Sequence, residues 1–134
     1  LLLKTIKSLE CGDYKLMQQN NVQVSHAPKI FHKDCSIEFD KSCKEVHDFI
    51  RGMSPYPTAW TILEGEKLKI FRSEIEIIPH SHEIGTIISD GKKFMKIAVN
   101  DGYIHLKILQ LTKRKRMDIS SFMNGYNLNV KKIG

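Results

Sequence analysis

Short β-prone runs separated by glycine-containing turns fill the sequence between residues 59 and 111, and this pattern is the strongest constraint on the fold. Asp90-Gly91 and Asp101-Gly102 each stand between runs rich in Ile, Val, Phe and Tyr. An Asp-Gly pair in such a position is a strong signal for a β-hairpin. The expected strands are residues 59–63, 68–78, 85–89, 94–99 and 103–111. The spacing therefore predicts a small β-sheet that curls into a closed or partly open barrel.

Two short helices are expected to flank these strands. Ser42 and Glu45 have the spacing of a capping box, in which the serine oxygen accepts from the N–H of Glu45 and the glutamate reaches back. An apolar stripe at helical spacing follows, and Gly52 ends it. Asp118 is placed to cap a second helix that ends near residues 124–125. We therefore predict a mainly β, α+β fold: a small OB-like Greek-key β-barrel with short flanking helices and an N-terminal linker arm.

The remaining segments lie outside the predicted barrel domain, which spans residues 42–125. Residues 1–12 carry Leu and Ile at helical spacing and end at a glycine, so they predict a helix. Because the chain opens with Leu inside this pattern, we expect a fragment whose first helix packed against preceding residues. Residues 13–41 are polar and aperiodic and predict a linker, and residues 126–134 predict a poorly ordered tail.

Catalytic and metal-binding patterns are weak in this sequence. Cys11, Cys35 and Cys43 are odd in number and form no CxxC pair, so reduced thiols are expected in place of a zinc site or disulfides. His80 and His82 share one predicted loop with few companion ligands, which favours a solvated loop over a metal site. No glycine-rich phosphate loop is present, and no run approaches the roughly 20 apolar residues of a membrane span. We therefore predict no catalytic residue, no metal and no membrane association.

Positive charge is concentrated in the second half of the chain. The net charge of the whole sequence is +6. Residues 1–66 hold eight Lys/Arg against nine Asp/Glu, a net charge of −1, whereas residues 67–134 hold thirteen against six, a net charge of +7. An asymmetric basic surface is the electrostatic pattern expected for a polyanion partner. A solvated basic surface without a partner is the alternative.

Lys113, Arg114, Lys115 and Arg116 form the sharpest local cluster of charge. If extended, this run would place its two lysines on one face and its two arginines on the other. Arginine can bind phosphate oxygens with two N–H groups, and lysine acts as a point charge. Phe94 and Tyr103 are the candidates for stacking on bases, although packing inside the barrel is the more frequent role for each. Four lysines of neighbouring predicted hairpins could extend the basic patch: Lys92, Lys93, Lys96 and Lys107.

Three segments in order resemble the methionyl-tRNA formyltransferase family. Residues 46–61 are similar to its I-R-G-hydrophobic-x-P-[WY]-P-x-A-[WF] junction between linker and barrel. Residues 26–30 resemble its [YH]-A-P-K-[IL] strip, and residues 115–125 resemble its closing K-[KR]-M…F-x-[NR]-G helix. Tyr56 stands where many members have Trp. The junction residues that carry the resemblance are Arg51, Gly52, Pro55, Pro57 and Trp60.

This resemblance implies a function for the parent protein. The full enzyme transfers a formyl group from 10-formyltetrahydrofolate to the amino group of methionyl-initiator tRNA in translation initiation. Its N-terminal Rossmann-like domain holds the folate, a catalytic Asn, His and Asp, and an S-L-L-P-x-x-R-G loop, none of which occurs in this sequence. Residues 1–12 would then be the last helix of that missing domain. We expect this fragment to be inactive alone, to bind no cofactor and to act as a cytoplasmic monomer that grips tRNA for the catalytic domain in cis.

Two alternatives remain open for a barrel of this kind. It could be the accessory barrel of a sugar-nucleotide formyltransferase or a formyltetrahydrofolate dehydrogenase, or a purely structural barrel. An enzyme with a small substrate does not need the net charge of +7 that residues 67–134 carry, so this charge favours tRNA as the partner. The expected contacts are with phosphates and with RNA shape, because few aromatic residues of the basic half look exposed.

Overall fold

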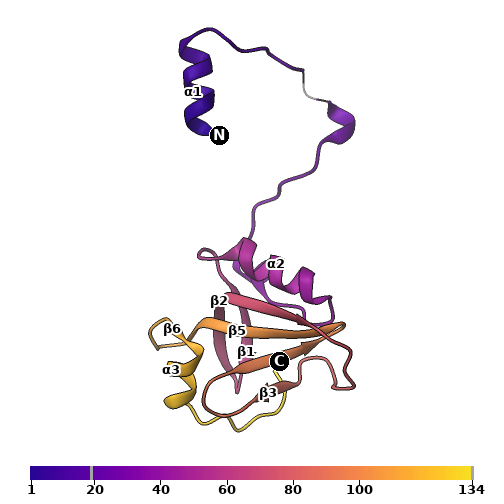
Figure 1. Ribbon diagram of the computed structural model, residues 1–134, viewed down its shortest axis with the longest axis vertical. Helices are drawn as coiled ribbons and strands as arrows, with labels where there is room; N and C mark the ends of the chain where they lie inside the picture. Colours follow the sequence, from indigo (N-terminus) through magenta and orange to yellow (C-terminus); the bar gives the residue numbers. More distant parts are fainter. Residues whose placement is uncertain (19, 134) are drawn as a thin grey trace.

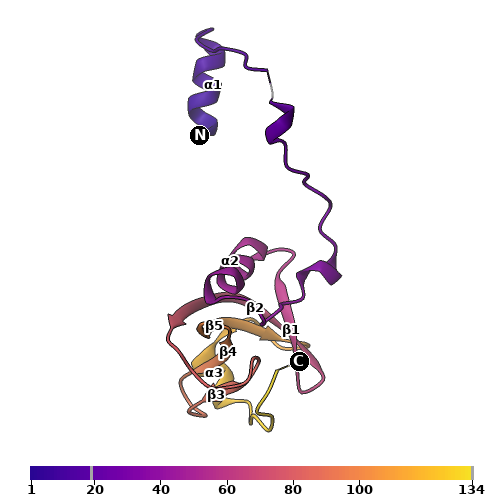
Figure 2. The same ribbon diagram turned by 90° about the vertical axis from the view of Figure 1, so that its right-hand side faces the viewer.

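The computed structural model describes residues 1–18 and 20–133 as an N-terminal arm followed by a folded body (Figure 1). The arm contains α1 (Leu2–Glu10) and a linker with two short 3₁₀ turns, η1 (Asn21–Gln23) and η2 (His32–Cys35). Figures 1 and 2 show α1 standing apart from the body at the end of this linker. The body contains α2 (Cys43–Met53), β1 (Ala59–Leu63), β2 (Glu66–Ile77), β3 (Ile87–Ser89), β4 (Met95–Val99), β5 (Gly102–Leu111), β6 (Met117–Asp118) and α3 (Ile119–Asn124).

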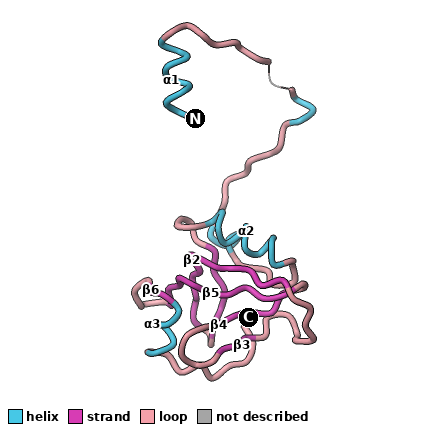
Figure 3. The backbone as a smooth tube through the Cα atoms, in the orientation of Figure 1, coloured by secondary structure: helices cyan, strands magenta, loops and turns pink. Residues whose placement is uncertain are grey.

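The six strands form one antiparallel sheet in the order β1-β2-β5-β4-β3, with β6 paired to β5. The long strands β2 and β5 pair along most of their length, and their register shifts on both sides of Arg72. In Figure 3, α2 and α3 lie at different ends of the strand layer. Within the described residues no pairing joins β1 to β3, so the barrel is not closed. The prediction of a mainly β, α+β fold is confirmed, and an OB-like barrel is compatible with this open sheet.

Both edges of the open sheet are covered by chain segments that are not strands themselves. At the β1 edge the N–H of Ile37 donates to the carbonyl of Trp60 at 2.9 Å. At the β3 edge the N–H of Ile87 donates to Lys131, and the N–H of Ile133 donates to Gly85 at 2.9 Å. The expectation of a poorly ordered tail is therefore wrong for residues 126–133. These segments satisfy some of the edge backbone groups and hinder pairing with another chain.

The core lies between the curved sheet, α2 and α3. The predicted capping box of α2 is present, because Glu45 donates its N–H to the Ser42 hydroxyl and accepts the Ser42 N–H at 3.0 Å. Asp101 adds a tertiary contact by accepting the N–H of Cys43 at 2.6 Å. The apolar stripe of α2 is buried, so sequence periodicity and packing agree at this helix. The core side chains from the segment before α2 are Cys35, Ile37 and Phe39.

Several local expectations differ from the structure. Helix α2 continues one residue past Gly52, β2 begins at residue 66, and β6 was not expected. The loop histidine His80 is half-buried, with its Nε2 atom 2.7 Å from the Val99 carbonyl oxygen, so it is not simply solvated. The run 113–116 is not extended, because Lys113 has a φ of +63° and turns the chain. The His80 contact joins segments 19 positions apart, whereas the early start of β2 follows from the tight hairpin that pairs Leu63 with Glu66.

Residues with metal-binding or nucleophilic chemistry are dispersed. Among residues 1–18 and 20–133 no group of three or more His, Cys, Asp or Glu side chains could hold a metal ion. All three cysteines are free, and burial raises the pKa of Cys43 to about 11, so its thiol stays protonated and is a poor nucleophile. In the described part of the chain, no helix has the length and apolar character needed to cross a membrane.

Candidate nucleic-acid interface

The outer side of β2 carries alternating cationic and aromatic residues. Lys67, Lys69 and Phe71 are partly exposed, whereas the intervening Leu68 and Ile70 are fully buried. This alternation follows from the period of two in a strand, in which successive side chains point to opposite faces. The pattern places two lysines and one aromatic ring on one side of the longest strand.

Cross-strand register adds partners to this row. Trp60 on β1 is paired with Lys69 on β2, which is paired in turn with Gln110 on β5. The Lys67 Nζ atom lies 4.2 Å from the centroid of the Trp60 ring. The Arg116 Cζ atom lies 4.2 Å from the centroid of the Phe71 ring. These cation–π contacts hold the charged groups over flat apolar rings at the surface.

Three hollows on this part of the surface adjoin one another, because neighbouring hollows share a lining residue. A hollow of about 360 Å³, which we call the junction hollow, is lined by Ile30, His32, Pro55, Tyr56, Pro57, Thr58, Lys69 and Phe71. A second hollow has Phe71 in common with the junction hollow, and its lining includes Arg51 and Arg72. A third has Lys69 in common with it, and its lining includes Lys67 and Lys113. We define the basic–aromatic face as Trp60, Lys67, Lys69, Phe71, Lys113 and Arg116.

The cations of the basic–aromatic face lack carboxylate partners. Within residues 1–18 and 20–133, Lys67, Lys69, Lys113 and Arg116 form no ion pair. No carboxylate lines the junction hollow or the hollow that contains Lys113. Four formal positive charges therefore remain available to an anionic ligand, which is the electrostatic requirement for phosphate binding.

The predicted basic run is divided by the turn at Lys113. Lys113 and Arg116 reach the basic–aromatic face, and Lys115 is exposed. Arg114 turns the other way: its Nη1 atom donates to the Gly125 carbonyl at 3.1 Å, and its guanidinium lies over the Tyr126 ring. Arg114 therefore holds the end of α3, which is a structural role.

The lysines predicted on the hairpin strands are placed differently. Lys96 forms an ion pair with Glu76 at 2.7 Å, and Lys107 forms one with Glu74 at 2.7 Å. The hydrogen bond from Lys96, followed by that from His105, lowers the pKa of Glu76. These carboxylates offset the positive charges of both lysines, so an RNA phosphate would have to compete with them.

Lys92 and Lys93 are exposed in the turn between β3 and β4. Their backbone N–H groups, together with that of Phe94, donate to the carboxylate of Asp90. These hydrogen bonds, the one from Lys93 being the largest cause, lower the pKa of Asp90 to about 2. The charge of Asp90 therefore lies in the same turn as the two lysines.

The junction residues form one wall of the junction hollow. Thr58 fixes this turn, because its N–H donates to Met53 at 2.8 Å and its hydroxyl donates to the Pro55 carbonyl. The peptide bonds before Pro55 and Pro57 are both cis. On the helix side of the junction, Arg51 is exposed and pairs with Asp48 at 3.1 Å, so its charge is partly offset.

Sequence reasoning missed the central residues of this interface. Lys67, Lys69 and Phe71 were not singled out, although their alternation with buried aliphatic residues was a readable signal. The stacking candidate Tyr103 is only 6% exposed and is not accessible, whereas Phe94 remains 36% exposed. Tyr56 at the junction, 88% exposed, and Phe71 on β2, partly exposed, are further accessible rings.

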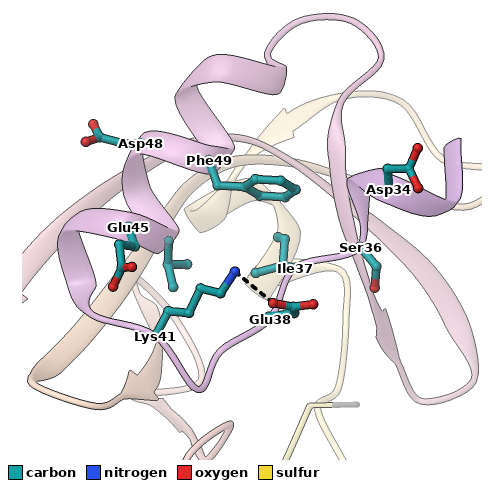
Figure 4. A pocket seen from close by; sticks show the side chains of 9 residues that line it. Asp34, Ser36, Ile37, Glu38, Lys41, Glu45, Asp48 and Phe49 are labelled. Carbon is teal, nitrogen blue, oxygen red and sulfur yellow. Dashed lines mark ion pairs between the residues drawn. The ribbon is translucent and has the colours of Figure 1, made fainter. Parts of the chain in front are cut away.

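A separate acidic hollow of about 510 Å³ lies between α2 and the segment before it (Figure 4). Ile37, Val46 and Phe49 provide apolar lining, and one ion pair joins Lys41 to Glu38 at 2.8 Å. Carboxylates dominate its polar rim and would repel phosphate, so this hollow is a poor candidate for RNA contact. The acidic residues that line it are Asp34, Glu38, Glu45 and Asp48.

The fold and this surface define a small antiparallel α+β domain with a basic, aromatic outer face. The chain belongs to the formyl transferase C-terminal domain family, which matches residues 29–127. This finding confirms the family resemblance noted in the sequence.

Curated relatives match nearly the whole chain. A methionyl-tRNA formyltransferase of Phocaeicola vulgatus is 38% identical over 136 residues, covering 94% of this chain and 42% of the relative. One from Parabacteroides distasonis is 43% identical over 105 residues, covering 75% of this chain and 32% of the relative. The chain thus spans less than half the length of these relatives.

Among solved structures, a multiply substituted variant of HypX from Aquifex aeolicus matches with a TM-score of 0.65 and 15% identity, covering 98% of this chain and 23% of that one. HypX in complex with tetrahydrofolic acid matches with a TM-score of 0.59, 16% identity and the same coverage. At these identities the likeness concerns the fold alone.

Proposed function

We propose that this chain is the tRNA-gripping C-terminal part of a methionyl-tRNA formyltransferase. In this role it positions methionyl-initiator tRNA for a preceding catalytic domain in the same chain, which transfers the formyl group from 10-formyltetrahydrofolate. The protein would act in the cytoplasm and as a monomer. The observation that carries the proposal is the set of four cations on the basic–aromatic face that have no carboxylate partner in the described structure. The names of the relatives support the choice of tRNA as the polyanion.

Binding of the tRNA would depend on neutralisation of its phosphates by basic side chains. Each phosphate that meets a Lys or Arg releases condensed counterions, so binding weakens as salt rises. Lys67 and Lys69 supply point charges along β2, and Arg116 can offer two N–H groups to one phosphate. The RNA-binding residues expected from the sequence are a different set, of which Arg114 also holds α3: Lys92, Lys93, Lys96, Lys107, Lys113, Arg114, Lys115 and Arg116. We place Lys67, Lys69, Lys113 and Arg116 at the centre of the RNA contact, because they have no carboxylate partner in the described structure and gather on one face with two aromatic rings.

Formyl transfer itself is assigned to the preceding domain. No catalytic residue or folate site is assigned to this chain, and the tetrahydrofolic acid complex of HypX supports folate use by the parent enzyme only by analogy. Helix α1 supports a domain in cis, because its apolar stripe is exposed and the described residues bury none of it. The side chains of that stripe are Leu2, Leu3, Ile6 and Leu9.

Titration of the 134-residue chain with initiator tRNA at several salt concentrations tests the proposal. We expect weak binding that declines steeply with salt. The double variant Lys67→Gln/Lys69→Gln should reduce the slope of log Kd against log salt by roughly 0.7–0.9 for each phosphate that the variant no longer neutralises. Arg114 is kept intact because its removal would also disturb α3.

The double variant Lys92→Gln/Lys93→Gln is the matched control, since it removes the same charge from a turn outside the basic–aromatic face. For this control the slope of log Kd against log salt should change less than for Lys67→Gln/Lys69→Gln. Absence of tRNA binding even at low salt would refute the proposed function. A larger effect of the control variant would move the interface to the β3–β4 turn.

A small-substrate parent enzyme is the second candidate. The sugar-nucleotide formyltransferases and formyltetrahydrofolate dehydrogenases differ in not needing a polyanion surface. Binding of tRNA that does not depend on salt, or no binding, would favour this candidate or a purely structural barrel. The chain alone should show no formyl transfer in any of these cases.

A further inference from the structure

The junction hollow has features that phosphate binding does not need. Tyr56 is 88% exposed at its edge, and the Phe71 ring forms part of its lining. Pro55 and Pro57 add rigid apolar walls, and Thr58 fixes their turn through its two hydrogen bonds. A large tyrosine ring held in solvent on a stiff turn gains little for folding. One exposed ring alone would indicate nothing, but here Tyr56 is continuous with the apolar surfaces of Pro55, Pro57 and Phe71, and a contiguous exposed apolar patch of this kind marks a candidate ligand site.

The chemistry of the lining matches a flat, polar-edged aromatic ligand. The hollow combines aromatic and proline surfaces with the exposed imidazole of His32, whose ring nitrogens can donate or accept. No carboxylate lines it, which disfavours a cationic ligand. Its volume of about 360 Å³ falls in the range of pockets for small ligands. Nucleobases are planar, carry donors and acceptors on their edges, and stack on aromatic side chains.

Cations for the adjoining phosphates lie at the margins of the hollow. Lys69 belongs to its lining, and Arg116 lies 4.2 Å from the ring of Phe71, which also belongs to it. Neither cation is ion-paired within the described residues. A nucleotide placed here would have its base against the rings and its backbone against the two positive charges.

We propose that the junction hollow receives one unpaired nucleobase of the bound RNA, stacked on Tyr56, with the flanking phosphates at Lys69 and Arg116. This inference rests on the proposed function and goes beyond it, because grip on phosphates alone requires no unpaired base. The proposed ring differs from the stacking candidates expected from the sequence, of which Tyr103 is buried and Phe94 is exposed outside the hollow.

The test uses two RNAs of identical charge. One is a hairpin with a short single-stranded 3′ end, and the other is the same hairpin with abasic sites throughout that end. The 134-residue chain should bind the base-bearing RNA about fivefold or more tightly, as expected for one stacked base. The salt dependence of both should be equal, because their phosphates are the same.

Tyr56→Ala should weaken binding of the base-bearing RNA to the abasic level and leave binding of the abasic RNA unchanged. Because Tyr56 is exposed, this variant is expected to keep its fold, which thermal unfolding checks. Tyr14→Ala, which removes an exposed ring from the arm, is the matched control and should change neither affinity.

Each other outcome has a distinct meaning. Salt-dependent but equal binding of the two RNAs by the wild-type chain overturns the base site and leaves the proposed function standing. Binding of neither RNA at low salt overturns the proposed function as well. A base preference that survives Tyr56→Ala, or an equal reduction for both RNAs, also overturns the base site.

Discussion

Gly102 stands at the point where β5, β2 and the start of α2 meet, and its replacement by alanine should be strongly destabilising. A Cβ atom built on Gly102 would overlap the carbonyl oxygen of Glu76 on β2 and would lie 3.0 Å from the Cys43 Sγ atom. Neither neighbour is a flexible side-chain end: one is strand backbone, and the other is a buried residue at the first turn of α2. The clash can be relieved only if the end of β5 moves away from β2.

The size of the effect follows from two contributions. Overpacking of a tight site costs about 1–3 kcal/mol. Disruption of the last pairing of the ladder, between Ile77 and Gly102, removes a hydrogen bond with a net contribution of about 0.5–1.5 kcal/mol. We therefore expect the free energy of unfolding to fall by about 2–4 kcal/mol, and Tm to fall by at least about 8 °C.

Urea unfolding followed by the fluorescence of Trp60, the single tryptophan, measures this change. Gly52→Ala is the matched control, because Gly52 lies in α2 with nothing within 4 Å of its built Cβ. It should stabilise the protein by about 0.4–1 kcal/mol. If Gly102→Ala changed the free energy of unfolding by less than about 0.5 kcal/mol, with the m-value unaltered, the close approach of β5 to β2 would be refuted.

Three further predictions concern charged and hydrogen-bonded groups. Asp118→Ala should reduce the free energy of unfolding by about 1 kcal/mol in the same urea assay, because Asp118 caps α3 by accepting the Ser121 N–H at 2.9 Å. The folded-state pKa of Asp90, about 2, lies below its ordinary value of 3.8, so its stabilisation is present above that value and is lost as pH falls through about 2. Asp90→Asn should therefore flatten acid unfolding in that range, which circular dichroism measures, and an unchanged acid profile would contradict this. Burial, followed by the hydrogen bond to Glu64, raises the pKa of Tyr126 to about 12, so this group stabilises the fold below pH 10 and loses that effect as pH rises through about 12. Ultraviolet titration should show one tyrosine ionising there in the wild type and at lower pH in Glu64→Gln.

Residues with the same charge contribute unequally to the basic surface. Lys67 and Lys69 have no carboxylate partner in the described structure, whereas Lys96 and Lys107 are neutralised by carboxylates on β2. The Lys107–Glu74 pair is largely exposed and contributes little to stability, so it matters mainly for the local potential, whereas the Lys96–Glu76 pair is partly buried. The net charge of +7 in residues 67–134 is therefore larger than the positive charge that RNA can reach on the sheet. The unpaired part of that charge is concentrated on the basic–aromatic face.

The sequence by itself determined most of the elements of this protein. Alternation of apolar residues and the Asp-Gly turns predicted five strands close to their observed positions, and Ser42 with Glu45 predicted the start of α2. The family motifs at the junction were also readable directly. These features depend on interactions between residues a few positions apart, and such interactions are encoded in short stretches of sequence.

Only the tertiary structure decided which side chains form the candidate interface. Phe71 and Arg116 meet across 45 positions because β6 pairs with β5 beside β2. The pairing of Lys107 with Glu74 likewise depends on the register of β2 and β5, which shifts near Arg72. A shift of one residue in that register would send each side chain to the other face. Periodicity cannot specify such long-range register, and so the sequence revealed an excess of positive charge but not the face on which it remains unpaired.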